Sequence, residues 1–274
     1  MLSKKLGIFA VLAALPVLAQ LPAGPVSQLT DAAISPRQHA PMRLHGSGAE
    51  ATRGAVESEN WSGYAVTGSS FTSAQGSWTV PTVNCTKTPN TYSSFWVGID
   101  GYSSSTVEQT GTDSDCDGRT PSYYAWYEFY PAGSVLISSV SVSPGNQMSA
   151  EVTYNGSEFT VTIKNETTGQ SFSTSGTVSG AARSSAEWIA EAPCCTRRGG
   201  ILPLADFGTV FLGDDYTGVS STNDATDSSI SGPISAFGSS VEAITMVSAR
   251  GALEAVPSAL TSDGTSFSVV WDSE

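Results

Sequence analysis

Positive charge and histidine are both scarce in this sequence. Its 274 residues include 12 Lys and Arg against 25 Asp and Glu, and the two histidines are His39 and His45. From Gly54 onward seven Lys and Arg oppose 23 Asp and Glu, a net formal charge of −16. Such a surface repels nucleic acid and anionic membranes, so neither is expected as a partner. It also repels itself at neutral pH, which fits an acidic working environment or, alternatively, a role of the charge in solubility alone.

Several sequence motifs of known chemistry are absent. The sequence has no Cys-x-x-Cys pair, no Gly-rich phosphate loop and no Asp-Thr-Gly or Asp-Ser-Gly turn of the pepsin type. If the leader that contains both histidines is removed, a Ser-His-Asp or Cys-His hydrolase and a His-bound zinc site are excluded as well. We therefore expect no metal and no cofactor. Carboxylates, amides, tyrosines and tryptophans remain for acid–base chemistry.

The N-terminal residues predict a leader in two parts. Two lysines precede an apolar run over 6–18, which ends in a small-residue cleavage pattern. We interpret 1–19 as a signal peptide, with cleavage after Ala23 as an alternative, and expect a secreted protein. The apolar run is too short to favour a transmembrane span. Residues 20–56 are rich in Ala, Pro, Ser and Gly and carry three arginines, which predicts a basic, largely disordered pro-segment.

The four cysteines are an even number, which in an exported protein indicates disulfides. They are Cys85, Cys116, Cys194 and Cys195, and three pairings are open. We favour Cys85–Cys116, because each lies in a polar loop beside the central stretch 93–131. Cys194 and Cys195 would then form a bridge between neighbours or stay reduced.

Residues 57–274 predict a single all-β domain. Short runs with a two-residue alternation recur throughout, and none has a helix-length period of 3.6 residues. In 147–154 every second residue is apolar or aromatic, Asn155-Gly156 follows as a hairpin turn signal, and 159–163 alternates again. Many short strands joined by polar turns favour an antiparallel β-sandwich.

The central stretch 93–131 and the segment 184–192 could form a cleft. Alternation along the predicted strands places one amide, several carboxylates and two tryptophans on the same side of the sheet: Trp96, Asp100, Gln109, Asp113, Trp126, Glu128, Glu187 and Glu191. This side could be no more than the solvated face of a sheet. Large aromatic residues beside acids are common in ligand grooves, however, and favour a cleft.

Long motifs in these segments carry a family resemblance. They are NWSGY (60–64), FWVGIDG (95–101), VEQTGTD (107–113), YAWYEFYP (124–131), NETTGQ (165–170), SSAEWIAE (184–191) and LPLADFG (202–208). In order and spacing they resemble the glutamic peptidases of the eqolisin family, from about Asn60 to Trp271. The resemblance implies a concanavalin- or lectin-like β-sandwich and a secreted acid endopeptidase, made as a precursor. We expect it to act as a monomer on polypeptides, with its own pro-segment as inhibitor.

The resemblance also implies the catalytic residues. The family glutamine lies in a Gln-Thr-Gly motif, here Gln109, and the family glutamate is matched to Glu187. Glu187 would take a proton from water and return it to the leaving amine. The Gln109 amide would donate to the oxyanion, a contribution of roughly 3 to 4 kcal/mol to transition-state stabilisation. Supporting cleft residues are Trp96, Asp100, Asp113, Trp126 and Glu128. This chain has Tyr124 where some family members have an acid.

Two other functions fit parts of the sequence. A β-sandwich glycoside hydrolase could use Glu128 and Glu187 as paired carboxylates among tryptophans. A carbohydrate-binding module would use the tryptophans without any catalysis. Replacement of Gln109 separates the first from a peptidase, because the glycoside hydrolase would keep substantial activity.

Overall fold

The computed structural model describes residues 36–46, 55–195, 200–220 and 222–273. The predicted signal peptide and much of the predicted pro-segment lie outside these residues. The strands are β1 (Ala55–Ser58), β2 (Trp61–Thr67), β3 (Ser73–Thr79), β4 (Ser94–Ile99), β5 (Val107–Asp117), β6 (Thr120–Tyr130), β7 (Val135–Ile137), β8 (Gln147–Tyr154), β9 (Phe159–Asn165), β10 (Ser171–Gly176), β11 (Ser185–Glu191), β12 (Thr209–Leu212), β13 (Asp224–Thr226), β14 (Ser231–Pro233), β15 (Val241–Val247), β16 (Leu253–Pro257) and β17 (Phe267–Trp271).

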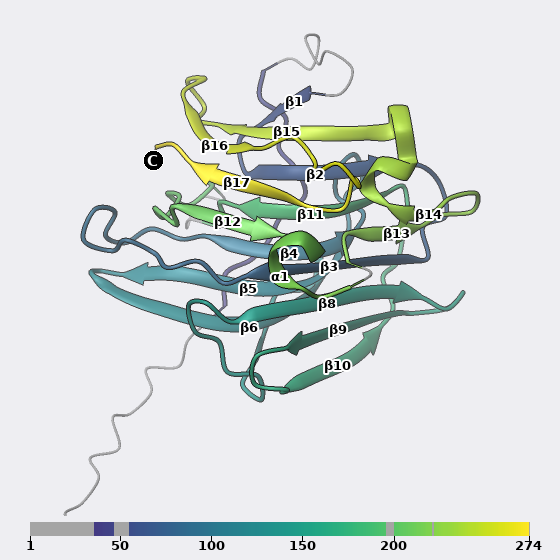
Figure 1. The fold of residues 1–274 in the computed structure, drawn as a ribbon, viewed down its shortest axis with the longest axis horizontal. Helices are drawn as coiled ribbons and strands as arrows, with labels where there is room; N and C mark the ends of the chain where they lie inside the picture. The colour runs from purple at the N-terminus through teal and green to yellow at the C-terminus, as the bar shows by residue number, and fades with distance from the viewer. Residues whose placement is uncertain (1–35, 47–54, 196–199, 221, 274) are drawn as a thin grey trace, which may run out of the picture. The chain divides into compact units, whose positions relative to one another are not determined.

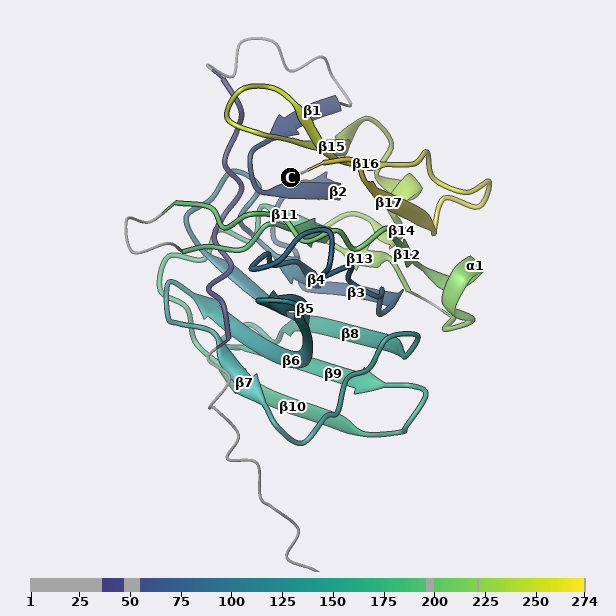
Figure 2. The same ribbon diagram turned by 90° about the vertical axis from the view of Figure 1, so that its left-hand side faces the viewer.

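The strands form two layers (Figures 1 and 2). One layer runs β7-β6-β5-β4-β11-β2-β15, with β1 added parallel to β15. The other runs β10-β9-β8-β3-β12-β17-β16, and the β15–β16 pair joins the two. Apart from β1–β15 these pairs are antiparallel, so the predicted all-β antiparallel fold is confirmed.

The main core lies between the two layers. From the first layer it receives Phe95, Val97 and Ile99 of β4, and from the second Met148 and Val152 of β8. These are the apolar positions that the alternation predicted. Burial of each such side chain stabilises the fold by roughly 1.5 to 3 kcal/mol. Because alternate β4 residues face this core, the other β4 residues face the opposite side of the first layer.

The hairpin predicted around Asn155-Gly156 is present as β8–β9, and β10 extends it to a three-stranded meander. The first connection is a four-residue loop, 155–158, in which the Asn155 side-chain oxygen accepts hydrogen bonds from the Ser157 and Glu158 backbone N–H groups. Within the described residues helical structure is limited to the four-residue α1 (Asp214–Thr217) and the 3-10 segment η1 (Ile234–Ser240). No helix among the described residues has the length and apolar character needed to cross a bilayer.

The favoured Cys85–Cys116 pairing is present, and of the two alternatives left open for Cys194 and Cys195 the structure has the bridge between neighbours. Cys85 is bonded to Cys116, and Cys194 is bonded to Cys195. The described cysteines are therefore all oxidised, which is typical of exported proteins.

The end of the predicted pro-segment differs from expectation. Residues 36–46, here called the leader strand, have a defined path along the first layer instead of being disordered. Gln38 forms an antiparallel bridge with Cys194, and Leu44 forms one with Ser58. The reason is that this stretch finds backbone partners and a buried surface that composition alone does not reveal.

Candidate active site

Strand register brings the predicted cleft residues onto one face. Gln109 on β5 lies opposite Glu128 on β6 and opposite Gly98 on β4, and Gly98 lies opposite Glu187 on β11. Directly opposed residues point to the same side of a sheet. The predicted face is therefore present, on the side of the first layer away from the main core.

The floor of this face is aromatic. Trp96 and Trp126 are fully buried and lie opposite Gly111, one on each neighbouring strand. A Cβ atom on Gly111 would lie 2.3 Å from the Phe95 carbonyl oxygen and 2.5 Å from the Trp96 Cβ atom. The glycine of the Gln-Thr-Gly motif is thus required by the close approach of β4 and β5 beside Gln109.

His39 of the leader strand fills the cleft. Its imidazole stacks on Trp126 at 3.6 Å between ring centroids and an interplanar angle of 10°. Nδ1 lies 3.2 Å from Glu191 Oε2, and Nε2 lies 3.7 Å from Asp113 Oδ1. The His39 side chain is fully buried. The histidine that we expected only as part of a removable leader therefore occupies the centre of the site.

The backbone of His39 is held by the predicted catalytic amide. The His39 carbonyl oxygen accepts a hydrogen bond from Gln109 Nε2 at 2.9 Å, and the His39 N–H donates to Glu128 Oε2 at 2.8 Å. The Ala40 backbone lies close enough to Glu191 to lower the pKa of its carboxyl against the larger effect of burial. The peptide bond between His39 and Ala40 therefore lies between Gln109 and Glu191.

Burial favours the neutral form of the groups around His39. It raises the pKa of Glu128 to about 9 and raises the pKa values of Asp113 and Glu191 well above the usual carboxyl range. Neighbouring carboxyls raise the pKa of each of them further. Burial also lowers the pKa of His39 well below its ordinary value. With the leader strand in place the site holds few charges.

Tyr124 bridges two carboxyls at the edge of the cleft. Its hydroxyl lies 2.7 Å from Asp113 Oδ2 and 2.9 Å from Asp115 Oδ2. Burial raises the pKa of Asp115 to about 6, while Tyr124 and Arg37 act to lower it. Arg37 of the leader strand lies 3.5 Å from Asp115 and over the Tyr92 ring at 4.2 Å. Tyr124, the residue that departs from the family pattern, therefore replaces an acid with a hydroxyl that hydrogen bonds to two acids.

Glu187 and Asp100 lie outside this group of contacts. The carboxyl of Glu187 is buried near Ser185, Asp100 and Glu108, and burial is the main reason that its pKa is raised. Neither of its oxygens has a hydrogen-bond partner among the described residues. Asp100 accepts hydrogen bonds from the backbone N–H groups of Arg183 and Ser184 at 2.7 and 3.0 Å, so it organises a turn.

The sequence reasoning placed Glu191 on the cleft face without giving it a role, and it missed His39 as a cleft residue. Glu191 Oε2 accepts a hydrogen bond from Trp96 Nε1 at 2.8 Å. Glu191 lies four residues after Glu187 on the same face of β11, and this alternation was the available signal. Nothing in the local sequence around His39 indicates that it enters the cleft.

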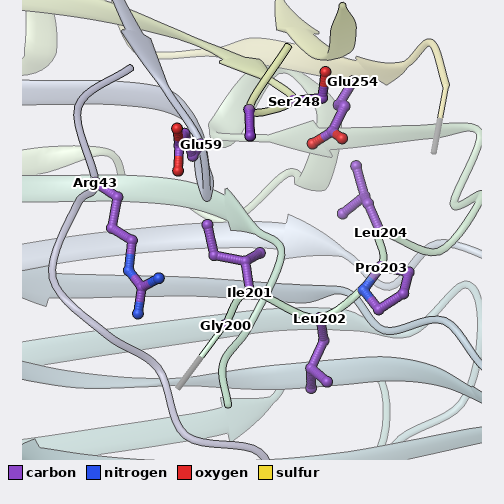
Figure 3. A pocket seen from close by; sticks show the side chains of 10 residues that line it. Arg43, Glu59, Gly200, Ile201, Leu202, Pro203, Leu204, Ser248 and Glu254 are labelled. Atoms are coloured by element: carbon purple, nitrogen blue, oxygen red, sulfur yellow. The ribbon is translucent and has the colours of Figure 1, made fainter. Parts of the chain in front are cut away.

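A separate hollow of about 620 Å³ lies beside the leader strand (Figure 3). Arg43 of the leader strand lines it together with Ile201, Leu202 and Pro203 of the loop that follows β11. Neither Gln109 nor Glu191 contributes to its lining. Among the described residues no cluster of His, Cys, Asp and Glu could hold a metal ion.

Comparisons with a family model and with known proteins agree on one family. The model of the Peptidase A4 family matches residues 59–253. Aspergillopepsin-2 of Aspergillus niger is 32% identical over 197 residues, which cover 63% of this chain and 69% of that protein. Scytalidopepsin B of Scytalidium lignicola is 34% identical over 175 residues, which cover 62% of this chain and 65% of that protein.

Solved structures resemble the whole β domain. The crystal structure of scytalido-glutamic peptidase with a transition state analog inhibitor has a TM-score of 0.64 and 26% identity, covering 78% of this chain and 98% of that chain. A member of the eqolisin family in complex with the tripeptide Ala-Ile-His has a TM-score of 0.62 and 25% identity over the same shares.

Proposed function

This chain is a glutamic endopeptidase of the Peptidase A4 family, also called the eqolisins, and we propose that Gln109 and Glu191 are its catalytic pair. The observation that carries the proposal is the peptide bond of the leader strand. Its carbonyl oxygen accepts a hydrogen bond from Gln109 Nε2 at 2.9 Å, and the Ala40 backbone contacts Glu191. We infer that a substrate binds along the same path as the leader strand.

Gln109 supplies the donor for the oxyanion. Its amide group already donates to the oxygen that becomes negatively charged when the carbonyl carbon turns tetrahedral. Glu128 Oε2 lies 3.3 Å from the same amide nitrogen and fixes its orientation. Because Gln109 is fully buried, the hydrogen bond acts in a low-dielectric site, where it is strongest.

Glu191 acts as base and then as acid. As a carboxylate it takes a proton from water, and the resulting hydroxide adds to the carbonyl carbon. Glu191 then returns the proton to the amide nitrogen as the C–N bond breaks, giving a carboxylic acid and an amine. The Ala40 backbone, which lowers the pKa of Glu191, and the contact of His39 Nδ1 with Glu191 Oε2 at 3.2 Å support a position of Glu191 beside the nitrogen that would leave. A raised pKa suits a group that must also donate a proton.

The test compares three conservative variants in protein digestion at pH 2 to 5. We expect Gln109→Ala and Glu191→Gln to lose at least a hundredfold in kcat, since each removes a group that acts on the reacting atoms. Glu187→Gln, a matched change on the same face of β11, should keep most of the activity. Folding of each variant is checked by circular dichroism.

The same experiment decides between the two glutamates. The family motif matched the base to Glu187, whereas the contacts in the cleft support Glu191. Loss of activity in Glu187→Gln with full activity in Glu191→Gln would return the role to Glu187. Full activity of Gln109→Ala would contradict the pair altogether.

We further propose that the leader strand is the chain's own inhibitor. It covers Gln109, Glu128 and Glu191 through His39, and a bound peptide at this position excludes substrate. Secretion, a monomeric state and removal of the pro-segment stay predictions of the sequence. Action on polypeptides in acid follows from the family and from the carboxyl chemistry, and the digestion assay tests it.

A further inference from the structure

The disulfide between Cys194 and Cys195 contacts the leader strand beside the catalytic pair. Cys194 follows Glu191 by three residues, so the end of β11 leads directly into the disulfide. The Gln38 N–H donates to the Cys194 carbonyl at 3.0 Å, and the Cys194 N–H donates to the Gln38 carbonyl at 2.8 Å. The leader strand is thus bound here by an antiparallel pair of backbone hydrogen bonds, which is a general way to hold an extended peptide.

The two sulfur atoms also meet the Gln38 side chain. Gln38 Oε1 lies 3.6 Å from the Cys195 sulfur and 4.0 Å from the Cys194 sulfur. Disulfide sulfurs carry no proton, so these contacts are van der Waals contacts with a polarisable surface. Cys194 is 2% exposed, and Cys195 is exposed, so the disulfide forms a wall that is open at one side.

The segment that carries the disulfide is fixed from several sides. The Ala192 N–H donates to the Asn60 carbonyl at 2.9 Å, and the Leu202 N–H donates to the Pro193 carbonyl at 2.9 Å. Cys194 also forms a bridge with Ile201. A wall held in this way keeps its place relative to Glu191, which is what selection of a substrate side chain requires.

We propose that the Cys194–Cys195 disulfide is a substrate subsite of the peptidase. It receives the side chain of the second residue before the scissile bond, the position that Gln38 occupies in the leader strand, and favours extended uncharged side chains there. The Cys194 backbone binds the same residue without regard to its side chain. The inference rests on the proposed function, because the scissile bond is assigned from the contacts of Gln109 and Glu191.

The first experiment measures selectivity at this position. Peptides of the sequence Arg-Gln-His-Ala-Pro-Met-Arg, with Gln or Gly as second residue, are given to the acid-treated full chain. The readout is kcat/KM if they are cut and the inhibition constant if they are only bound. We expect about a fivefold preference for Gln, the size of one moderate buried contact, which drops below about twofold in the Cys194→Ser/Cys195→Ser variant.

A matched control removes the other disulfide. Cys85→Ser/Cys116→Ser should lower thermal stability and keep the fivefold preference, because the sulfur atoms that meet the Gln38 side chain belong to Cys194 and Cys195. An equal preference in the wild type and the Cys194→Ser/Cys195→Ser variant would overturn the inference. So would a preference that is lost equally in both double variants, since that is the result of a purely structural role.

A second experiment does not depend on activity. In the full chain at pH 7, hydrogen exchange of the Gln38 amide reports how firmly the leader strand is held. We expect faster exchange in Gln38→Gly and in Cys194→Ser/Cys195→Ser, with effects that are not additive when combined. Additive effects would overturn the subsite. If the wild type digests no protein in acid, the proposed function fails, and this exchange cycle still decides whether the disulfide binds Gln38.

Discussion

At the scale of the residue, the choice between Glu187 and Glu191 shows how a site is built. Both lie on the same face of β11, four residues apart, and both are fully buried. Both are close to other acids, Glu187 to Asp100 and Glu108 and Glu191 to Glu128 and Asp113, but Glu191 also meets the Trp96 indole and the leader strand. A carboxyl with a fixed donor on one oxygen and a peptide nitrogen nearby is better placed for proton transfer than one that lacks both.

The hydrogen bond from Trp96 Nε1 should tune the base. It lowers the pKa of Glu191 against the larger effect of burial. In Trp96→Phe that donor is lost, so the pKa of Glu191 rises and a smaller fraction is carboxylate in acid. We expect the acid limb of the pH profile of kcat to move up by about one unit, and kcat at pH 3 to fall about tenfold.

The control for this prediction is Trp126, which does not donate to Glu191. Trp126→Phe keeps an aromatic floor, and in the leader-bound state Trp126 Nε1 has no hydrogen-bond partner among the described residues. The acid limb should stay in place in that variant. An unchanged limb in Trp96→Phe would show that Glu191 is not the group whose titration controls activity.

At the scale of the element, docking of the leader strand depends on pH through two opposing effects. Burial lowers the pKa of His39, so docking weakens as the pH falls below the ordinary histidine value of about 6.5. Burial raises the pKa values of Asp113, Glu128 and Glu191, which favours docking as the pH falls toward about 4.5. Below that pH the protonation of these carboxyls differs little between the docked and the undocked state, so His39 alone continues to change the docking.

We therefore expect docking of the leader strand to be strongest near pH 4.5 and to weaken below it by about 1.4 kcal/mol per pH unit through His39. His39→Phe removes the titration and keeps a ring on Trp126. This variant should hold the leader strand as firmly at pH 3 as at pH 4.5, whereas the wild type should hold it less firmly at pH 3. The measurement is leader-strand hydrogen exchange at pH 3 and pH 4.5.

Arg37 makes a second pH-dependent contribution to the docking of the leader strand, and its replacement separates this contribution from that of His39. Its partner Asp115 has a pKa raised to about 6 by burial, so the ion pair weakens in acid. Arg37→Gln should loosen the leader strand at pH 7 but leave its release at pH 3 dependent on His39. Equal release of the wild type and His39→Phe at pH 3 would rule out the histidine as the trigger.

At the scale of the whole molecule, buried acids couple stability to pH. Burial raises the pKa of Glu108 to about 9, with Asp100 as a second cause. A folded-state pKa above the unfolded value means that unfolding releases a proton between about pH 4.5 and 9, so stability is full in acid and is lost as the pH rises. The net charge of −16 from Gly54 onward acts in the same direction.

Glu108→Gln should flatten this dependence. The wild type loses up to about 3 kcal/mol between pH 4 and pH 7 because of this one group, and the variant should not. Chemical denaturation at the two pH values measures the difference. Asp117→Asn, an exposed change of the same charge on the same strand, should leave the slope nearly unchanged. An identical slope in Glu108→Gln would contradict a raised pKa for Glu108.

Much of the fold and part of the site followed from local sequence. Alternation along 94–99 separated Phe95, Val97 and Ile99 from Trp96 because side chains of a strand alternate whatever its neighbours are. The disulfide Cys85–Cys116 was favoured from cysteine count and loop position, although Cys116 lies within β5 and not in a loop. The family motifs led to Gln109 and to the cleft face, because such motifs carry chemistry and backbone geometry together.

Tertiary structure alone decided which groups meet. Gln109 holds the His39 carbonyl, and Glu191 lies close to the same peptide bond. This proximity depends on the register of β11, β4 and β5 and on the path of the leader strand. No local sequence pattern encodes the register or the path. His39 lies 70 residues from Gln109 in sequence, so their contact depends on how the leader strand lies along the first layer. The sequence by itself determined the alternating faces, the chemical types and the family. The three-dimensional arrangement decided the partners, because contacts between distant segments depend on how the strands pair.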